Sequence, residues 1–169
     1  INHPDLVNNL VPGYDFFDDD NNPAPYLDKP MGAHGTMCAG LAAAQGNNSI
    51  GVSGVAWNCK IMPIRIATAD DFVTDADLAT AFRWAAEHGA DILSNSWGGG
   101  YSTQVLSSAI RDITKQNGIG RNGKGCIVCF AAVNWEDGGP VDYPASLSDV
   151  IAVGATDHKD EVWYYSASG

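Results

Sequence analysis

The chain has 169 residues, of which 45% are hydrophobic and 17% charged, a composition typical of a folded globular protein with a sizeable core. Its formal net charge of -11 argues against nucleic acid as a partner. No apolar run approaches the roughly 20 residues that a membrane-spanning helix needs, so we expect no membrane partner either. We therefore expect a single domain over residues 1–169.

The first part of the chain is predicted to be irregular. Residues 11–30 combine proline, glycine and asparagine with the acidic residues Asp15 and Asp18 to Asp20, which is typical of a loop. The acidic run has two interpretations. A solvated acidic turn is the favoured one, and a cation site is the alternative.

A helix is expected over residues 34–45, because small apolar residues follow His34 until glycine and asparagine end the pattern. A helix of glycine, alanine and cysteine has little bulk and can lie deep in a domain. The positive end of a helix disfavours a protonated imidazole, so His34 at this end is suited to accept a proton. A core histidine that only satisfies a hydrogen bond is the alternative.

Strands and helices alternate in the remainder of the chain. We expect strands over residues 60–66, 91–96, 126–132 and 150–153, and helices over residues 75–88 and 102–116, the first capped by Thr74 or Asp75. This alternation predicts an α/β fold with βαβ units and a parallel, doubly wound sheet covered by helices on both faces. Functional residues should lie in loops at the carboxyl ends of the strands.

Two short motifs are rejected as functional sites. Cys126 and Cys129 form a CxxC within an apolar run, but side chains three apart on a strand point to opposite faces. We interpret them as small buried hydrophobic residues, not as a redox pair. Residues 118–123 match GxGxxG, but they follow a helix and open a strand, whereas a dinucleotide loop does the reverse.

The segment HGTMCAG at residues 34–40 resembles the histidine motif of the subtilisin-like serine proteases, or subtilases, and its cysteine form resembles the proteinase K and kexin branches. Further segments extend the resemblance over nearly the whole chain, namely NNSIGVSGVA (47–56), SNSWGGG (94–100), AAVN (131–134) and DYPASLSDVIAVGATD (142–157). The resemblance implies a subtilisin-like three-layer sandwich. We expect it to be incomplete at both ends, because the family's aspartate motif would precede residue 1 and its Gly-Thr-Ser motif is absent.

The resemblance implies two catalytic residues. His34 would be the base of a serine endopeptidase, and Asn134 would donate to the oxyanion of the tetrahedral intermediate. A loop residue that caps a turn is the alternative for Asn134. We expect a catalytic-domain fragment that acts on polypeptides when complete and is inactive by itself, with an inactive pseudoprotease or a peptide-binding module as the alternative.

The same resemblance implies a substrate site. The segment Asn95, Ser96, Trp97 and Gly98 resembles the strand that pairs with extended peptide, and Ala132 and Val133 would line the adjoining pocket. Subtilases usually carry glycine in place of Val133. We therefore expect that the pocket is narrowed or that this loop is displaced.

Calcium is the cofactor that the resemblance implies, and no organic cofactor is expected. The implied ligands are all oxygen atoms, which suit this ion, and they belong to the Asp5 carboxylate, the Asn48 side chain and the carbonyls of Gln45, Ile50 and Val52. Family resemblance also implies a secreted or extracytoplasmic protein, with a propeptide as a partner besides the polypeptide substrate.

Overall fold

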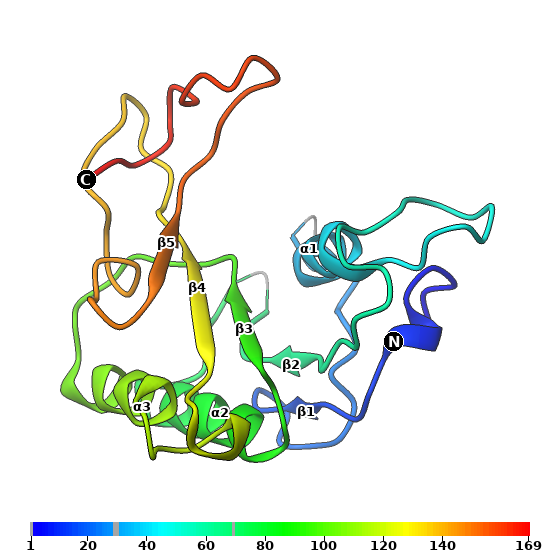
Figure 1. Ribbon diagram of the computed structural model, residues 1–169, viewed down its shortest axis with the longest axis horizontal. Helices are drawn as coiled ribbons and strands as arrows, with labels where there is room; N and C mark the ends of the chain where they lie inside the picture. The colour runs from blue at the N-terminus through cyan, green and yellow to red at the C-terminus, as the bar shows by residue number, and fades with distance from the viewer. Residues whose placement is uncertain (1, 29–30, 69) are drawn as a thin grey trace. The chain divides into compact units, whose positions relative to one another are not determined.

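The computed structural model describes residues 2–28, 31–68 and 70–169 (Figure 1). The chain divides into two compact units, Ile1–Ala81 and Phe82–Gly169, and each is described by itself. The expectation of one domain over residues 1–169 stays a prediction. The predicted loop over residues 11–30 ends on Lys29 and Pro30, which lie outside the described residues.

The second unit is built on three parallel strands, in the order β3 (Ile92–Asn95), β4 (Ile127–Ala131) and β5 (Ile151–Val153) (Figure 1). Their register sets Ile92 opposite Ile127, and Cys129 opposite Ile151. The α/β class and the parallel pairing are therefore confirmed. Each strand lies inside its predicted range, one or two residues shorter at the ends.

The helices of the chain follow their predicted patterns closely. Helix α2 (Asp75–Glu87) begins after Thr74, whose Oγ1 accepts a hydrogen bond from the Asp77 N–H at 3.3 Å, as an N-cap residue does. Helix α3 (Gln104–Thr114) buries a face of residues three and four apart, Leu106, Ala109, Ile110 and Ile113. Neither these nor any other helix of the described residues is long and apolar enough to cross a bilayer.

Aromatic packing holds one face of this sheet. Phe130 of β4 is buried, and the Phe82 ring of α2 lies parallel to it with centroids 6.0 Å apart. Trp97, two residues after β3, meets the same Phe130 ring edge-on at 5.0 Å. The alternate side chains of the strands, Ile92, Ile127, Ile151 and Val153, point to the other face and are exposed. This aromatic cluster of Phe82, Trp97 and Phe130 holds the chain in place where it leaves β3.

The first unit contains a smaller parallel pair, β1 (Tyr14–Asp15) and β2 (Ile64–Arg65), besides the 3₁₀ turn Val7–Asn9. The strand predicted over residues 60–66 is shortened because Pro63, which has no N–H to donate, interrupts it. Before this proline only an isolated bridge joins Ile61 to Leu10. Strand β1 was not predicted, because two residues inside an acidic loop carry no periodicity.

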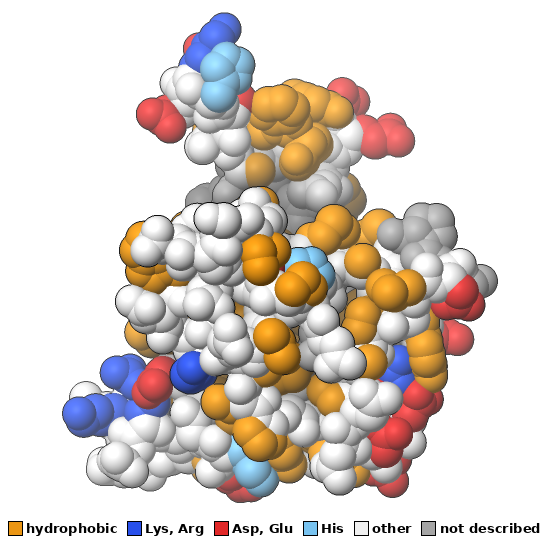
Figure 2. All heavy atoms as spheres, turned by 90° about the vertical axis from the view of Figure 1, so that its right-hand side faces the viewer, with side chains coloured by type: hydrophobic (Ala, Val, Ile, Leu, Met, Phe, Trp, Pro, Cys, Tyr) orange, Lys and Arg blue, Asp and Glu red, His pale blue; other side chains and the backbone are white. Residues whose placement is uncertain are grey.

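Helix α1 (His34–Ala43) begins at the predicted residue and ends two residues early. It ends there because the Gln45 N–H donates to the Asp5 carbonyl, at 2.9 Å, and not to the preceding turn of the helix. The predicted deep burial is not found, since Met37 and Leu41 are 55% and 71% exposed. Apolar residues occupy every side of this helix, so no single face directs it inward. Figure 2 shows hydrophobic side chains spread among polar ones over one face of the molecule.

The acidic run corrects another expectation. Asp15 is fully buried and pairs with Arg65, whose Nε lies 2.5 Å from its Oδ2. Asp18 also contacts Arg65 and accepts a hydrogen bond from Tyr26, and this bond, with help from the Arg65 charge, lowers the pKa of Asp18. The favoured interpretation of a solvated turn is therefore wrong for Asp15, because β2 brings the Arg65 cation beside this buried carboxylate, whereas Asp18 stays exposed.

Candidate active site and calcium site

His34 is the first residue of α1, as its motif predicted. Its backbone N–H donates to the Met31 carbonyl at 3.0 Å, and its ring Nε2 lies 3.8 Å from the Cys38 sulfur, one turn along the helix. The residue is partly buried, so part of its surface is open to solvent. A histidine so placed is accessible to a proton donor or acceptor that approaches the helix end.

Asn134 lies in the second unit, in the loop that follows β4. An isolated antiparallel β-bridge joins Asn134 to Ser166. Next to it, the Ala167 N–H donates to the Val133 carbonyl at 3.1 Å and extends the contact. The residue itself is exposed, which leaves its amide accessible to a ligand. Asn134 and His34 belong to different units.

The predicted peptide-binding segment lies at the carboxyl end of β3, as expected. Asn95 ends the strand, and its side-chain amide donates to the Cys129 carbonyl of β4 at 3.1 Å. Trp97 turns its ring into the aromatic cluster described above. From Gly98 onward the main chain is exposed. The segment therefore anchors its side chains in the unit and presents glycine backbone to the outside.

Ala132 and Val133 follow directly after β4, and Val133 contacts the segment of Gly98. Ala132 is buried, and its N–H donates to the Val153 carbonyl at 2.9 Å. Val133 has a φ of 80°, and its Cγ1 lies 2.7 Å from the position that a Cβ on Gly98 would occupy. Only glycine at position 98 leaves room for this valine side chain. Apart from the departure from the family's glycine at position 133, no feature of the sequence indicates this contact.

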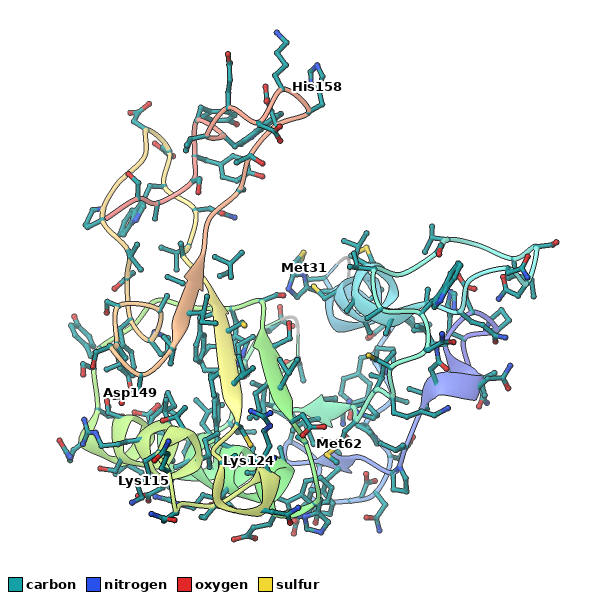
Figure 3. All side chains as sticks on the ribbon, viewed as in Figure 1. Met31, Met62, Lys115, Lys124, Asp149 and His158 are labelled. Carbon is teal, nitrogen blue, oxygen red and sulfur yellow. The ribbon has the colours of Figure 1, made fainter. Side chains whose placement is uncertain are left out.

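Figure 3 places the rejected GxGxxG segment at the other end of the sheet. Lys124, which follows this segment, lies at the start of β4, whereas His158 lies at the tip of the loop after β5. The segment follows α3 and precedes β4, as predicted. It therefore does not adjoin the loops that carry Gly98 and Asn134.

Two residues of the predicted calcium site, Asn48 and Val52, contact the buried carboxylate of a third, Asp5, in the first unit. The Oδ1 of Asp5 accepts a hydrogen bond from the Asn48 amide at 2.9 Å, and its Oδ2 accepts one from the Val52 N–H at 2.8 Å. These two bonds, that from Asn48 first, lower the pKa of Asp5 below its usual range. The Gln45 N–H binds the Asp5 carbonyl. The structure thus gathers Asp5, Gln45, Asn48 and Val52.

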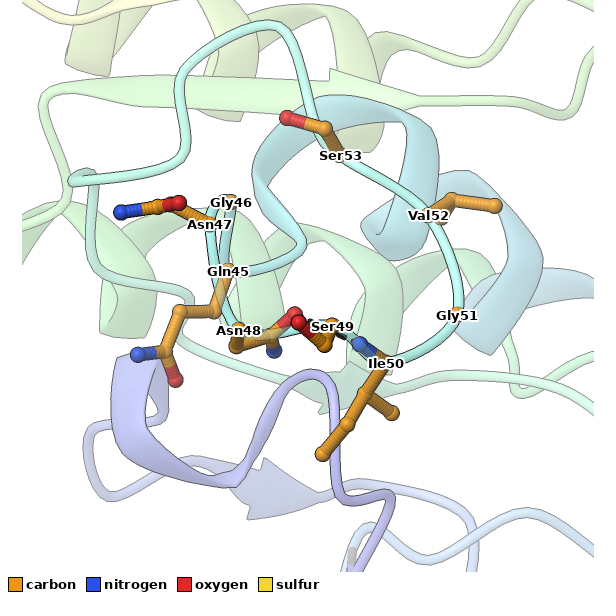
Figure 4. Close-up of a pocket in the computed structure, with 9 residues that line it drawn as sticks. All are labelled: Gln45, Gly46, Asn47, Asn48, Ser49, Ile50, Gly51, Val52 and Ser53. Carbon is orange, nitrogen blue, oxygen red and sulfur yellow. Dashed lines mark hydrogen bonds between the residues drawn. The ribbon is translucent and has the colours of Figure 1, made fainter.

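The loop beside Asp5 forms a pocket lined by residues 45–53 (Figure 4). Its shape depends on residues with positive φ, including Gly51 at 50°, where a Cβ would lie 2.4 Å from the Asp5 Oδ2. The Ile50 N–H donates to the Asn48 side-chain oxygen at 3.1 Å and tightens the turn. The sequence predicts a tight loop over residues 46–52, but it carries no signal that Gly51 must leave room for the Asp5 carboxylate.

The donor set suits a hard cation. The loop of residues 45–53 offers side-chain and carbonyl oxygen atoms as metal ligands, and the Asp5 carboxylate lies beside it. No group of three or more His, Cys, Asp or Glu side chains gathers anywhere in the described parts of the chain. For Asn48 to ligate, its amide would turn so that its oxygen, not its nitrogen, faces the carboxylate.

Comparisons with known proteins agree with these observations. A family model described as the Subtilase family matches residues 1–169. Thermitase of Thermoactinomyces vulgaris is 36% identical over 168 residues, which are 99% of this chain and 55% of that protein. A calcium-dependent protease of Nostoc sp. is 41% identical over 135 residues, 72% of this chain and 20% of that protein. Kexin of Saccharomyces cerevisiae is 37% identical over 159 residues, which are 87% of this chain and 18% of that protein.

A solved structure gives the same picture in three dimensions. Sphericase superposes with a TM-score of 0.77 and 28% sequence identity, over 98% of this chain and 54% of that one. The chain spans about half the length of thermitase, and less of the other relatives.

Proposed function

The chain belongs to the subtilase family, and from that premise we propose that it forms part of the catalytic domain of a serine endopeptidase that hydrolyses peptide bonds in polypeptides. The observation that supports this most is the position of His34, within the HGTMCAG motif and at the start of α1, in a family match that covers the whole chain.

His34 acts as the general base in this proposal. Its imidazole takes the proton from the hydroxyl of a nucleophilic serine as that oxygen attacks the substrate carbonyl, and it later returns the proton to the leaving amine. The position of this partly buried residue at the start of α1 supports the assignment, because the helix holds its backbone and part of its surface is open to solvent. No motif within these 169 residues supplies the aspartate that orients the imidazole or the nucleophilic serine.

Asn134 donates its side-chain amide to the oxyanion in the same proposal. The negative charge on that oxygen exists only in the tetrahedral intermediate, so the donor lowers the barrier without tightening substrate binding. The exposed position of Asn134 after β4 and the bridge to Ser166 support this role. The extended substrate runs along the exposed glycines from Gly98, where a peptide can add its main chain to the strand.

We also propose that a calcium ion binds at the loop of residues 45–53. The Asp5 carboxylate, the Asn48 side-chain oxygen and the carbonyls of Gln45, Ile50 and Val52 would hold it. A bound divalent cation ties the loop to the segment of Asp5 and stabilises both. Support comes from the oxygen donors and from the 41% identical relative that is named a calcium-dependent protease.

The remaining parts of the proposal rest on family membership alone. They are export from the cytoplasm, a propeptide as a partner, and the absence of activity in the isolated 169-residue chain.

The test uses the natural protein that contains this chain. Replacing the base, in the variant His34→Ala, should lower kcat for a casein or peptide substrate by roughly 10⁶-fold, because base and nucleophile act as one unit. His88→Ala is the matched control, since His88 is exposed and stacks on Trp84. Peptide binding without hydrolysis by the natural protein would instead favour a pseudoprotease or a peptide-binding module.

A further inference from the structure

Three segments of the second unit meet beside Gly98. The Gly99 N–H donates to the Tyr143 carbonyl at 2.7 Å, which holds the glycine segment from one side. A Cβ on Gly98 would lie 3.6 Å from the same carbonyl and 3.7 Å from the Ala131 carbonyl. On the remaining side it would meet the Val133 Cγ1 at 2.7 Å. The space next to Gly98 is thus filled by the side chain of Val133.

The backbone of Val133 is held in a conformation that valine rarely adopts. Its φ of 80° lies in the left-handed region, where a β-branched side chain is strained. The flanking bonds keep it there, since Ala132 donates to the Val153 carbonyl at 2.9 Å and Ala167 donates to the Val133 carbonyl at 3.1 Å. These bonds hold the backbone of Val133, and its Cγ1 lies against Gly98. Strain of this kind gathers at ligand-binding sites.

The neighbours of Val133 indicate which part of a substrate it meets. Asn134, the next residue, is the proposed donor to the reacting carbonyl, and the glycines from Gly98 are the proposed track of the substrate main chain. Consider a substrate residue whose carbonyl lies at Asn134 and whose main chain follows the glycines from Gly98. Its side chain projects between the segment of Asn134 and the segment of Gly98. That is where the Val133 methyl groups lie.

We propose that Val133 is a size filter that restricts the substrate residue on the acyl side of the cleaved bond to glycine, alanine or serine. This inference rests on the proposed function, and it names the substrate class of that site. A larger side chain, an aromatic ring above all, overlaps with Val133 against Gly98. Apolar pockets discriminate by about 10- to 200-fold for each methylene group that does not fit, so the preference should be easy to measure.

The test compares the natural protein with its Val133→Gly variant. Glycine adopts a φ of 80° without strain, so this variant should fold at least as well as the original. Val133→Ala keeps the Cβ and should give an intermediate result. Asn117→Gly is the matched control, because Asn117 also has a positive φ, 59°, but lies in the loop that precedes β4 and not in the one that follows it.

Two readouts are measured with peptides of the form Ala-Ala-Pro-Xaa, where Xaa is alanine, leucine or phenylalanine. The first is kcat/KM for the corresponding anilides. The second is the affinity for the product peptides that end in a free carboxylate at Xaa, measured by calorimetry, which needs no catalysis. The natural protein and Asn117→Gly should favour alanine over phenylalanine by at least about tenfold, and Val133→Gly should shift this ratio toward phenylalanine by about tenfold or more.

The outcomes separate this inference from the proposed function. A natural protein that accepts phenylalanine as well as alanine, or a ratio that Val133→Gly leaves within about twofold, overturns the filter. If no anilide is cleaved, the proposed function fails, and the ratio of product affinities still decides whether Val133 selects by size. Product peptides that bind to neither protein would count against the filter as well.

Discussion

The Arg65 guanidinium lies over the ring of Tyr26, 4.1 Å from its centroid, while its Nε faces the buried carboxylate of Asp15 at 2.5 Å. One side chain on β2 thus holds both β1 and the loop that follows it. The first prediction concerns the stability of this arrangement.

Replacing Arg65 by methionine should destabilise the natural protein by about 3–5 kcal/mol, because the change leaves the Asp15 carboxylate buried without its counter-charge. Urea unfolding measures the difference. Arg111→Met is the control, since Arg111 pairs with Asp149 at 3.8 Å in an exposed position and should cost less than about 1 kcal/mol. Equal losses in the two variants would show that the buried pair contributes little.

Calcium should raise the melting temperature of the natural protein, and a chelator should lower it. An ion that binds only the folded state adds about 2.7 kcal/mol when its concentration is a hundred times the dissociation constant. Asp5→Asn should remove the response, because it neutralises the buried carboxylate of the proposed site. Asp28→Asn, at an exposed carboxylate of the same unit, should keep it. A response that survives Asp5→Asn would place the ion elsewhere.

Acid should destabilise the metal-free protein partly through Asp5. Hydrogen bonds from Asn48 and Val52 lower the pKa of the folded carboxyl below its ordinary value. The stabilisation is therefore present above the pKa of the unfolded chain and is lost as the pH falls through the lowered folded value. Unfolding free energies of the natural protein and of Asp5→Asn, measured in EDTA, should converge as the pH falls below about 4. Parallel curves would contradict this assignment.

The glycine next to Asp5 should not tolerate a side chain. In Gly51→Ala the new Cβ would lie 2.4 Å from the Asp5 Oδ2, at a φ of 50° that alanine disfavours. We expect a lower melting temperature and a weaker calcium response. Gly89→Ala controls for the φ effect, because Gly89 has a φ of 94° and nothing described lies within 4 Å of its Cβ position. Similar calcium responses in both variants would argue against a contact with the site.

Asn134→Ala should lower kcat by roughly a hundred- to a thousandfold while KM changes little, because an oxyanion donor acts in the transition state and not in substrate binding. Steady-state kinetics of the natural protein and the variant measure both constants. Asn21→Ala, at an exposed loop residue, is the control. A rise in KM with unchanged kcat would instead make Asn134 a binding residue.

Most of the helices and strands after residue 74 were predictable because their signals are local. The apolar spacing of Leu106, Ala109 and Ile113 predicts α3, and Thr74 marks the start of α2 by its capping side chain. The apolar run around Val128 predicts β4 in the same way. In each case the residues that carry the signal lie within one turn or one strand of each other.

The site was predictable in part. The motif at His34 gave the start of α1, and the resemblance to subtilases gave the partners of Asp5, because motif residues keep their spacing. The burial of α1 was not predictable from composition, since small apolar residues permit a buried position without requiring one. The pairing of Asp15 with Arg65 was missed for a related reason, because an acidic run does not say which cation lies beside it.

The sequence by itself determined the family and the alternation of strands and helices, and it named the residues that we propose do chemistry, because these depend on side-chain type and on spacing along the chain. Only the tertiary structure decided that Gly51 must make room for Asp5 and that Val133 fills the space beside Gly98. Such contacts join residues far apart in the sequence, and their geometry follows from backbone angles and packing that the order of residues does not reveal.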